Sequence, residues 1–169
     1  MTPTDLFLTL FNHKSRNFDE LKWPGEGTFE VVLGAILVQN TNWKNVEKAL
    51  DNLKKANKDS LQGICELENS ELATLIKPSG FYNTKAKRLK ILCLAIKNEF
   101  ESFENFKENA SREWLISVKG VGAETCDAIL AYACGKPYMV VDAYALRIMA
   151  YFDYTFESYD EAAEWFSSL

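Results

Sequence analysis

The sequence has little glycine and proline and no long apolar run, and each shortage excludes a class of protein. Its 169 residues include 8 Gly and 4 Pro, too few turn residues for a sandwich of many short strands. The longest uncharged apolar run, residues 31–38, has eight residues, whereas a membrane span needs about 20. The N-terminus carries Asp5 and no basic leader. We therefore expect no membrane partner and an intracellular protein.

The cysteines lack the spacing of a metal site. No two are separated by two or four residues, the intervals typical of zinc and iron–sulfur ligands. The sequence therefore predicts free, mostly buried thiols, no metal ligands and no cofactor. The four positions are Cys65, Cys93, Cys126 and Cys134.

Charge is distributed unevenly along the chain. The net charge of −5 resides in residues 148–169, which carry five acids and no Lys or Arg. Residues 72–98 carry six cations and no carboxylate. This stripe is either a footprint for nucleic-acid phosphates or an ordinary solvated helix face. The six are Lys77, Lys85, Lys87, Arg88, Lys90 and Lys97.

Apolar residues recur at helical spacing through most of the chain, which predicts an all-α fold. Residues 29–37 form a helix that is apolar on most sides and is expected to be central and buried. Gln39-Asn40-Thr41-Asn42 interrupts the pattern before a second helix begins near Trp43. A long helix follows the turn Pro78-Ser79-Gly80.

Residues 111–134 read as two short helices joined by the tight turn Lys119-Gly120-Val121-Gly122. Glycines permit positive φ and a close approach of another molecule to the backbone. The N–H groups of such a turn and of the following helix can bind a phosphate oxygen, with Lys119 as a nearby point charge. A plain helical hairpin with a glycine turn explains the same residues.

Asp142 follows three apolar residues, Met139 to Val141, and precedes another predicted helix. An acid at such a position is either a helix N-cap or a partly desolvated functional carboxylate. The two roles are compatible.

These residues resemble a known family. Val118 to Arg147, with its Gly-Val-Gly turn and Val140-Val141-Asp142, resembles the helix-hairpin-helix (HhH-GPD) DNA glycosylases of the endonuclease III superfamily. Trp23-Pro24, Gln39-Asn40-Thr41 and residues 78–89 look most like the 3-methyladenine DNA glycosylase III branch. The resemblance covers about residues 20–150.

The resemblance implies an endonuclease III-like fold. Residues 25–135 would form a six-helix barrel domain that contains the helix-hairpin-helix motif at 111–134. Residues 1–24 and 136–169 would form a second helical domain. Relatives continue beyond the point that matches Leu169, so we expect this second domain to be C-terminally incomplete, with exposed apolar surface and reduced or absent activity of this chain by itself.

The resemblance also implies a partner and a site. The partner would be double-stranded DNA with a damaged base, without an obligate protein partner, and the target nucleotide would be flipped out of the duplex. Asp142 would be the catalytic carboxylate. Gln39 would fill the gap left by the flipped base. The other implied contacts are Lys119, Gly120, Val121 and Gly122 with the DNA backbone, and Trp23, Pro24 and Trp43 with the base.

Two departures from the wider family refine the prediction. Bifunctional members carry a lysine two residues after the Gly-Val-Gly turn, where this chain has Glu124. Without that amine no Schiff base forms, so a monofunctional enzyme is predicted. The four-cysteine iron–sulfur loop of many relatives is also missing, as in the methyladenine branch. An N3- or N7-alkylated purine is already cationic, so it leaves easily and stacks on aromatic rings.

Two alternatives remain open on the sequence. One is an endonuclease III-like glycosylase with lyase activity, acting on oxidised or mismatched bases. The other is a non-enzymatic helix-hairpin-helix module that binds DNA.

Overall fold

The computed structural model describes residues 2–13 and 23–168, and these residues form helices joined by turns and extended segments. No strand occurs among them, which confirms the all-α prediction. The α-helices are α1 (Pro3–Asn12), α2 (Phe29–Leu37), α3 (Trp43–Lys55), α4 (Leu61–Glu66), α5 (Asn69–Leu75), α6 (Tyr82–Phe100), α7 (Phe103–Asn109), α8 (Arg112–Ser117), α9 (Ala123–Ala128), α10 (Ala143–Ala150) and α11 (Tyr159–Ser167).

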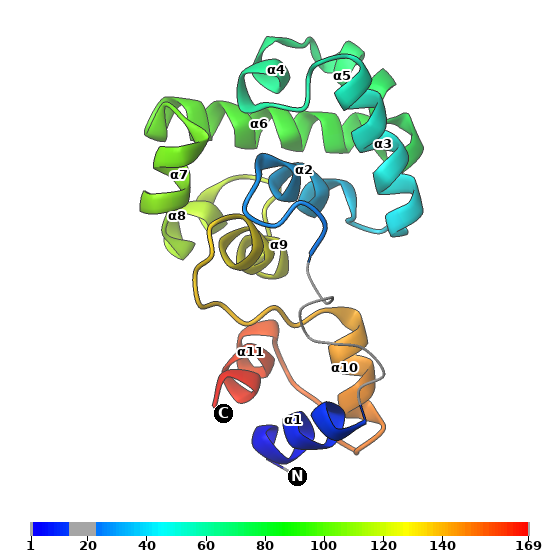
Figure 1. The fold of residues 1–169 in the computed structure, drawn as a ribbon, viewed down its shortest axis with the longest axis vertical. Coiled ribbons are helices and arrows are strands. Elements are labelled where there is room, and N and C mark those ends of the chain that lie inside the picture. Colours follow the sequence, from blue (N-terminus) through cyan, green and yellow to red (C-terminus); the bar gives the residue numbers. More distant parts are fainter. Residues whose placement is uncertain (1, 14–22, 169) are drawn as a thin grey trace.

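The helices lie in two groups (Figure 1). Helices α2 to α9 pack together, and α1, α10 and α11 lie beside them with both ends of the chain. The main hydrophobic core extends from Phe29 to Ala133 and so belongs to the first group. The division into domains at residues 25 and 135 stays a prediction.

Helix α2 runs through the centre of the first group, as its sequence predicts. Every residue from Val31 to Leu37 is buried, because the sequence is apolar on all sides. The Thr28 hydroxyl accepts a hydrogen bond from the Glu30 N–H at 3.3 Å and caps the helix. Gly34 lets the Trp43 ring approach closely: a Cβ at that position would lie 3.3 Å from the ring. This contact positions Trp43.

The predicted hairpin is present. Ser111 caps α8 by accepting a hydrogen bond from the Trp114 N–H at 3.1 Å. Helix α9 then continues into a π-helical turn, Ile129–Ala133, which the sequence pattern did not predict. An extended segment leads from this turn to Asp142, the N-cap of α10. The hairpin and Asp142 are thus joined by a short stretch of chain.

The second group of helices covers less of its apolar surface than the first. Helix α1 contacts α11, yet large apolar side chains remain exposed on α1, on α10 and after α10; Tyr151 is 82% exposed. Across residues 2–13 and 23–168, no helix combines the length and hydrophobicity that a membrane crossing requires.

Candidate nucleic-acid interface and active site

The turn of the hairpin depends on Gly120. Its φ is +97°, and a Cβ there would lie 2.6 Å from Cγ of Arg88. Both the conformation and the contact therefore require glycine. Gly122 differs, because a Cβ there would have no neighbour within 4 Å. The hairpin thus presses Gly120 onto α6 and presents Gly122 to solvent.

The structure divides the predicted DNA contacts into two kinds. Lys119 and Gly122 are exposed, and no side chain caps the N-terminus of α9. Val121 corrects the prediction: its side chain is buried, and its N–H donates to the Val118 carbonyl at 3.1 Å. Val121 therefore shapes the turn, and its amide is not a free donor to phosphate. The outward amides after it remain the candidates.

Gln39 is bonded to the hairpin. Its Nε2 donates to Thr125 Oγ1 at 3.1 Å and to the Gly120 carbonyl at 3.4 Å. Nη1 of Arg88 donates to its Oε1. In this conformation the amide is not available to DNA, so filling the gap behind a flipped base requires these bonds to break. Sequence reasoning missed Arg88 and Thr125, whose role appears only once α2, α6 and α9 are assembled.

An aromatic cluster lies beside the end of the hairpin. Trp23 stacks on Tyr132 with ring centroids 4.8 Å apart and planes at 16°. It meets Trp43 edge-on at 5.4 Å. The structure thus brings the two predicted tryptophans together, with Pro24 exposed next to them. The buried Nε1 of Trp23 has no hydrogen-bond partner. Tyr132 was missed, because an aromatic residue near a helix end carries no distinctive signal.

Asp142 is the N-cap of α10, the first of the two roles that the sequence left open to it. Its role as a functional carboxylate stays a prediction. Its Oδ1 accepts hydrogen bonds from the N–H groups of Tyr144 at 3.0 Å and Ala145 at 2.8 Å. The carboxylate is half-buried. These bonds fix the side chain at the start of α10, next to the segment that leaves the hairpin.

Glu124 and Tyr132 lie within electrostatic reach of Asp142. Desolvation raises the pKa of Glu124, and the negative charge of Asp142 raises it further. The pKa of Tyr132 is also raised, first by burial and then by the charges of Asp142 and Glu26. The charges of Asp142 and Glu26 therefore reach the Tyr132 ring of the aromatic cluster, and the charge of Asp142 also reaches Glu124.

Three of the six cations in the basic stripe make internal contacts. Lys85 is 1% exposed, and its Nζ donates to the carbonyls of Leu37 and Ser79, both at 2.7 Å. Lys90 donates to backbone carbonyls at the end of α4, and Arg88 binds Gln39. The two lysines bind carbonyls at helix C-termini, and Arg88 donates to the half-buried amide oxygen of Gln39. Lys77 and Lys87 are exposed, so only these two and Lys97 remain candidates for contact with nucleic-acid phosphates.

Lys85 makes stability depend on pH. Burial, and then the charge of Arg88, lowers the pKa of Lys85 from 10.5 to about 8. Between these values the unfolded chain binds the proton more tightly, so this contribution to stability rises with pH. Relative to Lys85→Met, the wild type should gain about 2 kcal/mol of unfolding free energy between pH 7.5 and pH 10. Denaturant unfolding of both proteins across that range measures the difference, and a constant difference would contradict the burial of this charge.

The four cysteines do not form a ligand set. All are free; Cys93 and Cys126 are buried and Cys65 and Cys134 are half-buried. Within the described part of the chain, no group of three or more His, Cys, Asp and Glu side chains could hold a metal ion. These residues therefore do not fit a four-cysteine iron–sulfur cluster.

The structure thus presents a helical hairpin with an outward glycine turn, followed by an aspartate that caps the next helix. The model of the HhH-GPD superfamily of base excision DNA repair proteins matches residues 33–167. The chain belongs to this family. Its enzyme class is that of the DNA glycosylases of base excision repair.

Relatives support this membership. A Methanocaldococcus jannaschii protein that bears the name of a DNA repair glycosylase is 44% identical over 154 residues, 85% of this chain and 69% of its own length. The crystal structure of H. pylori 3-methyladenine DNA glycosylase bound to 1,N6-ethenoadenine matches with 40% identity and a TM-score of 0.91, over 99% of this chain and 81% of that one.

A third solved structure that matches this chain contains DNA. A trapped covalent endonuclease III–DNA intermediate has a TM-score of 0.78 at 20% identity, over 97% of this chain and 76% of that one. At this identity the match supports the fold alone.

Proposed function

We propose that this chain is a monofunctional DNA glycosylase that releases alkylated purines, above all N3-alkylated ones, from double-stranded DNA. The observation that carries the proposal is the Asp142 carboxylate, held by two backbone N–H groups beside the hairpin, with Glu124 where a bifunctional enzyme has lysine. The likeness to the H. pylori methyladenine glycosylase supports the choice of substrate. The proposed reaction uses no cofactor. It takes place inside the cell, in the cytoplasm or nucleoid.

The chemistry follows from the position of the charge. The bond between the base and C1′ breaks with its electron pair leaving on the base, and the sugar becomes cationic. Asp142 stabilises that cation and orients the attacking water, whose proton it accepts. Both hydrogen bonds to Asp142 reach Oδ1, so Oδ2 is the oxygen that faces the reaction.

The surroundings of the aromatic cluster favour a cationic base. Cation–π attraction contributes up to about 2 kcal/mol when the partners are desolvated. The charges of Glu26, Glu124 and Asp142 act on the same region and attract a positive base. A neutral oxidised or mismatched base gains neither contribution.

A panel of lesion-bearing duplexes tests this proposal. The protein is incubated with duplexes that contain 3-methyladenine, 7-methylguanine, 1,N6-ethenoadenine, uracil, thymine opposite guanine, or thymine glycol. Free base and alkali-labile sites are measured separately. Release confined to the alkylated purines supports the proposal, and release confined to uracil or thymine glycol contradicts it. Salt-sensitive binding without release of any base indicates a DNA-binding module.

Borohydride trapping tests the absence of a lyase step. We expect no covalent adduct between the wild-type protein and DNA, because Glu124 cannot form a Schiff base. Glu124→Lys places an amine in the same turn of α9, within reach of Asp142, and should give an adduct on gel electrophoresis. This variant shows that the assay detects an imine at that position. An adduct with the wild type would contradict the monofunctional mechanism.

A further inference from the structure

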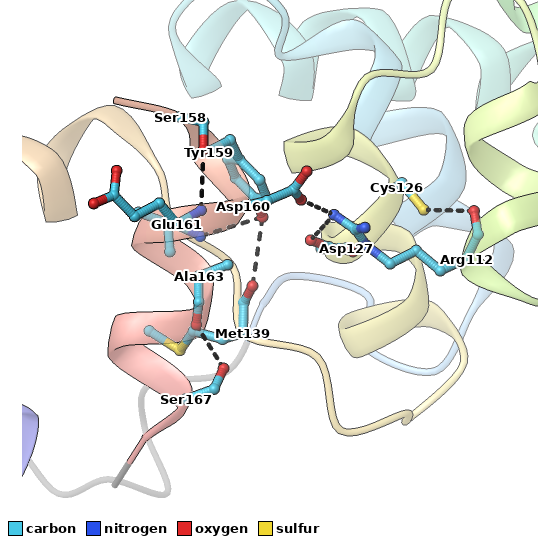
Figure 2. Close-up of polar contacts among 11 residues, drawn as sticks. Arg112, Cys126, Asp127, Met139, Ser158, Tyr159, Asp160, Glu161, Ala163 and Ser167 are labelled. Atoms are coloured by element: carbon cyan, nitrogen blue, oxygen red, sulfur yellow. Dashed lines mark hydrogen bonds and ion pairs between the residues drawn. The ribbon is translucent and has the colours of Figure 1, made fainter. Parts of the chain in front are cut away.

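A buried carboxylate in the hairpin takes no part in the mechanism above. Asp127 of α9 is 2% exposed. It accepts two hydrogen bonds from Arg112, from Nε to Oδ1 at 2.7 Å and from Nη2 to Oδ2 at 3.2 Å. The same Nη2 donates to Asp160 Oδ1 on α11 at 2.6 Å. The pair joins both helices of the hairpin to the second group of helices (Figure 2).

Stability alone does not explain this ion pair. Desolvation of two charges offsets much of their attraction, and an apolar pair of similar volume is often as stable. The arrangement does fix geometry, because a planar guanidinium binds a carboxylate through two parallel bonds. The two parallel bonds fix α8 against α9, and the bond from Arg112 to Asp160 connects α11 to them.

Tyr159 extends this arrangement to the chain that carries Asp142. Its hydroxyl lies 3.5 Å from the Val141 N–H, from which it accepts, and 3.4 Å from the Met139 carbonyl, to which it donates (Figure 2). Burial raises the pKa of Tyr159, and the charge of Asp127 raises it further, so the hydroxyl keeps its proton.

The contact with Tyr159 is important because the segment before Asp142 has little other support. From the described residues, no backbone–backbone hydrogen bond reaches residues 139–141. The Val141 side chain is buried, but apolar packing is not directional. Tyr159 therefore supplies the directional contact next to Asp142.

We propose that Asp127, Arg112 and Tyr159 are positioning residues that hold the Asp142 carboxylate at a fixed distance from the hairpin. This inference rests on the proposed glycosylase function. The hairpin holds the DNA strand and Asp142 acts on its sugar, so the distance between them sets the reaction rate. A displacement of about 1 Å can cost about 100-fold in rate.

Tyr159→Phe tests this inference, because it removes one hydroxyl and leaves the ring. Single-turnover release is measured with enzyme in excess over a duplex that contains the best substrate of the panel. We expect the rate constant to fall at least tenfold, the amplitude to stay complete, and Kd for a duplex with an abasic-site analogue to change less than twofold. Asp127→Asn should act in the same direction.

Tyr151→Phe is the matched control, because it removes a hydroxyl from a tyrosine that is 82% exposed. It should keep the wild-type rate constant within twofold.

The outcomes separate positioning from folding and from the proposed function. A lower amplitude or melting temperature with an unchanged rate constant means that Tyr159 acts only on folding, and it overturns the inference. If the wild type releases no base, the proposed function fails. Amide hydrogen exchange then tests the positioning contact in the absence of measurable activity. Tyr159→Phe should speed exchange at Val141, Tyr144 and Ala145, and unchanged exchange rates overturn the inference.

Discussion

Asp142→Asn is expected to lower the rate constant of base release by about 10²–10⁴-fold while DNA affinity stays within about threefold. Asparagine caps a helix as well as aspartate does, so its Oδ1 can keep the bonds to the N–H groups of Tyr144 and Ala145. The variant therefore removes the charge and the base that accepts a proton, and leaves the local fold. Single-turnover release and fluorescence anisotropy with an abasic-site analogue measure the two quantities.

Asp142→Ala completes this experiment. It should lose activity to the same extent and also about 1 kcal/mol of stability, because the cap is lost. If Asp142→Asn releases base at the wild-type rate, the carboxylate has no place in the mechanism. If Asp142→Asn loses DNA affinity as well, Asp142 contributes to DNA binding.

Gly120→Ala is expected to destabilise the protein by roughly 2–4 kcal/mol and to abolish detectable DNA binding. The φ of +97° disfavours any side chain, and the added Cβ would lie 2.6 Å from Cγ of Arg88. Relief of that clash displaces Arg88 from Gln39, so the turn and its neighbour move together. Denaturant unfolding measures the stability, and anisotropy measures the binding.

Gly122→Ala is the matched control, because it adds the same methyl group two residues away. Nothing lies within 4 Å of a Cβ at this position and φ is −95°, so stability should change by less than about 0.5 kcal/mol. DNA binding should still weaken if the backbone of this turn approaches the phosphates. Equal stability losses in the two variants would contradict the account of Gly120.

The sequence predicted what depends on local pattern. Helix α2 follows from its apolar residues, the hairpin from Gly120 and Gly122, and the capping role of Asp142 from its place before a helix. The resemblance assigned Trp23 and Trp43 to one site, and the structure brings the two rings into contact. Each of these features depends on residues close together in the chain or on a motif with a fixed spacing.

What the sequence could not predict depends on contacts between distant residues. The six cations of residues 72–98 looked alike, yet Lys85 is buried under the end of α2 and Arg88 holds Gln39. The internal hydrogen bond of the Val121 amide depends on the exact course of the turn. Asp127 looked like one more acid of a helix until Arg112 and Tyr159 were placed beside it.

The bonds of Gln39 have a consequence for the search along DNA. Under the proposed function Gln39 would enter the duplex, and it would first have to break a hydrogen bond to a charged donor, worth about 1.5–3 kcal/mol, and its contacts with Thr125 and Gly120. The protein would therefore slide along intact base pairs in one step and separate them in another. The hydrogen bonds of Gln39 contribute to the barrier between the two steps. A base that is already weakly paired lowers the remaining cost, so the retracted glutamine biases the search toward damage before chemistry begins.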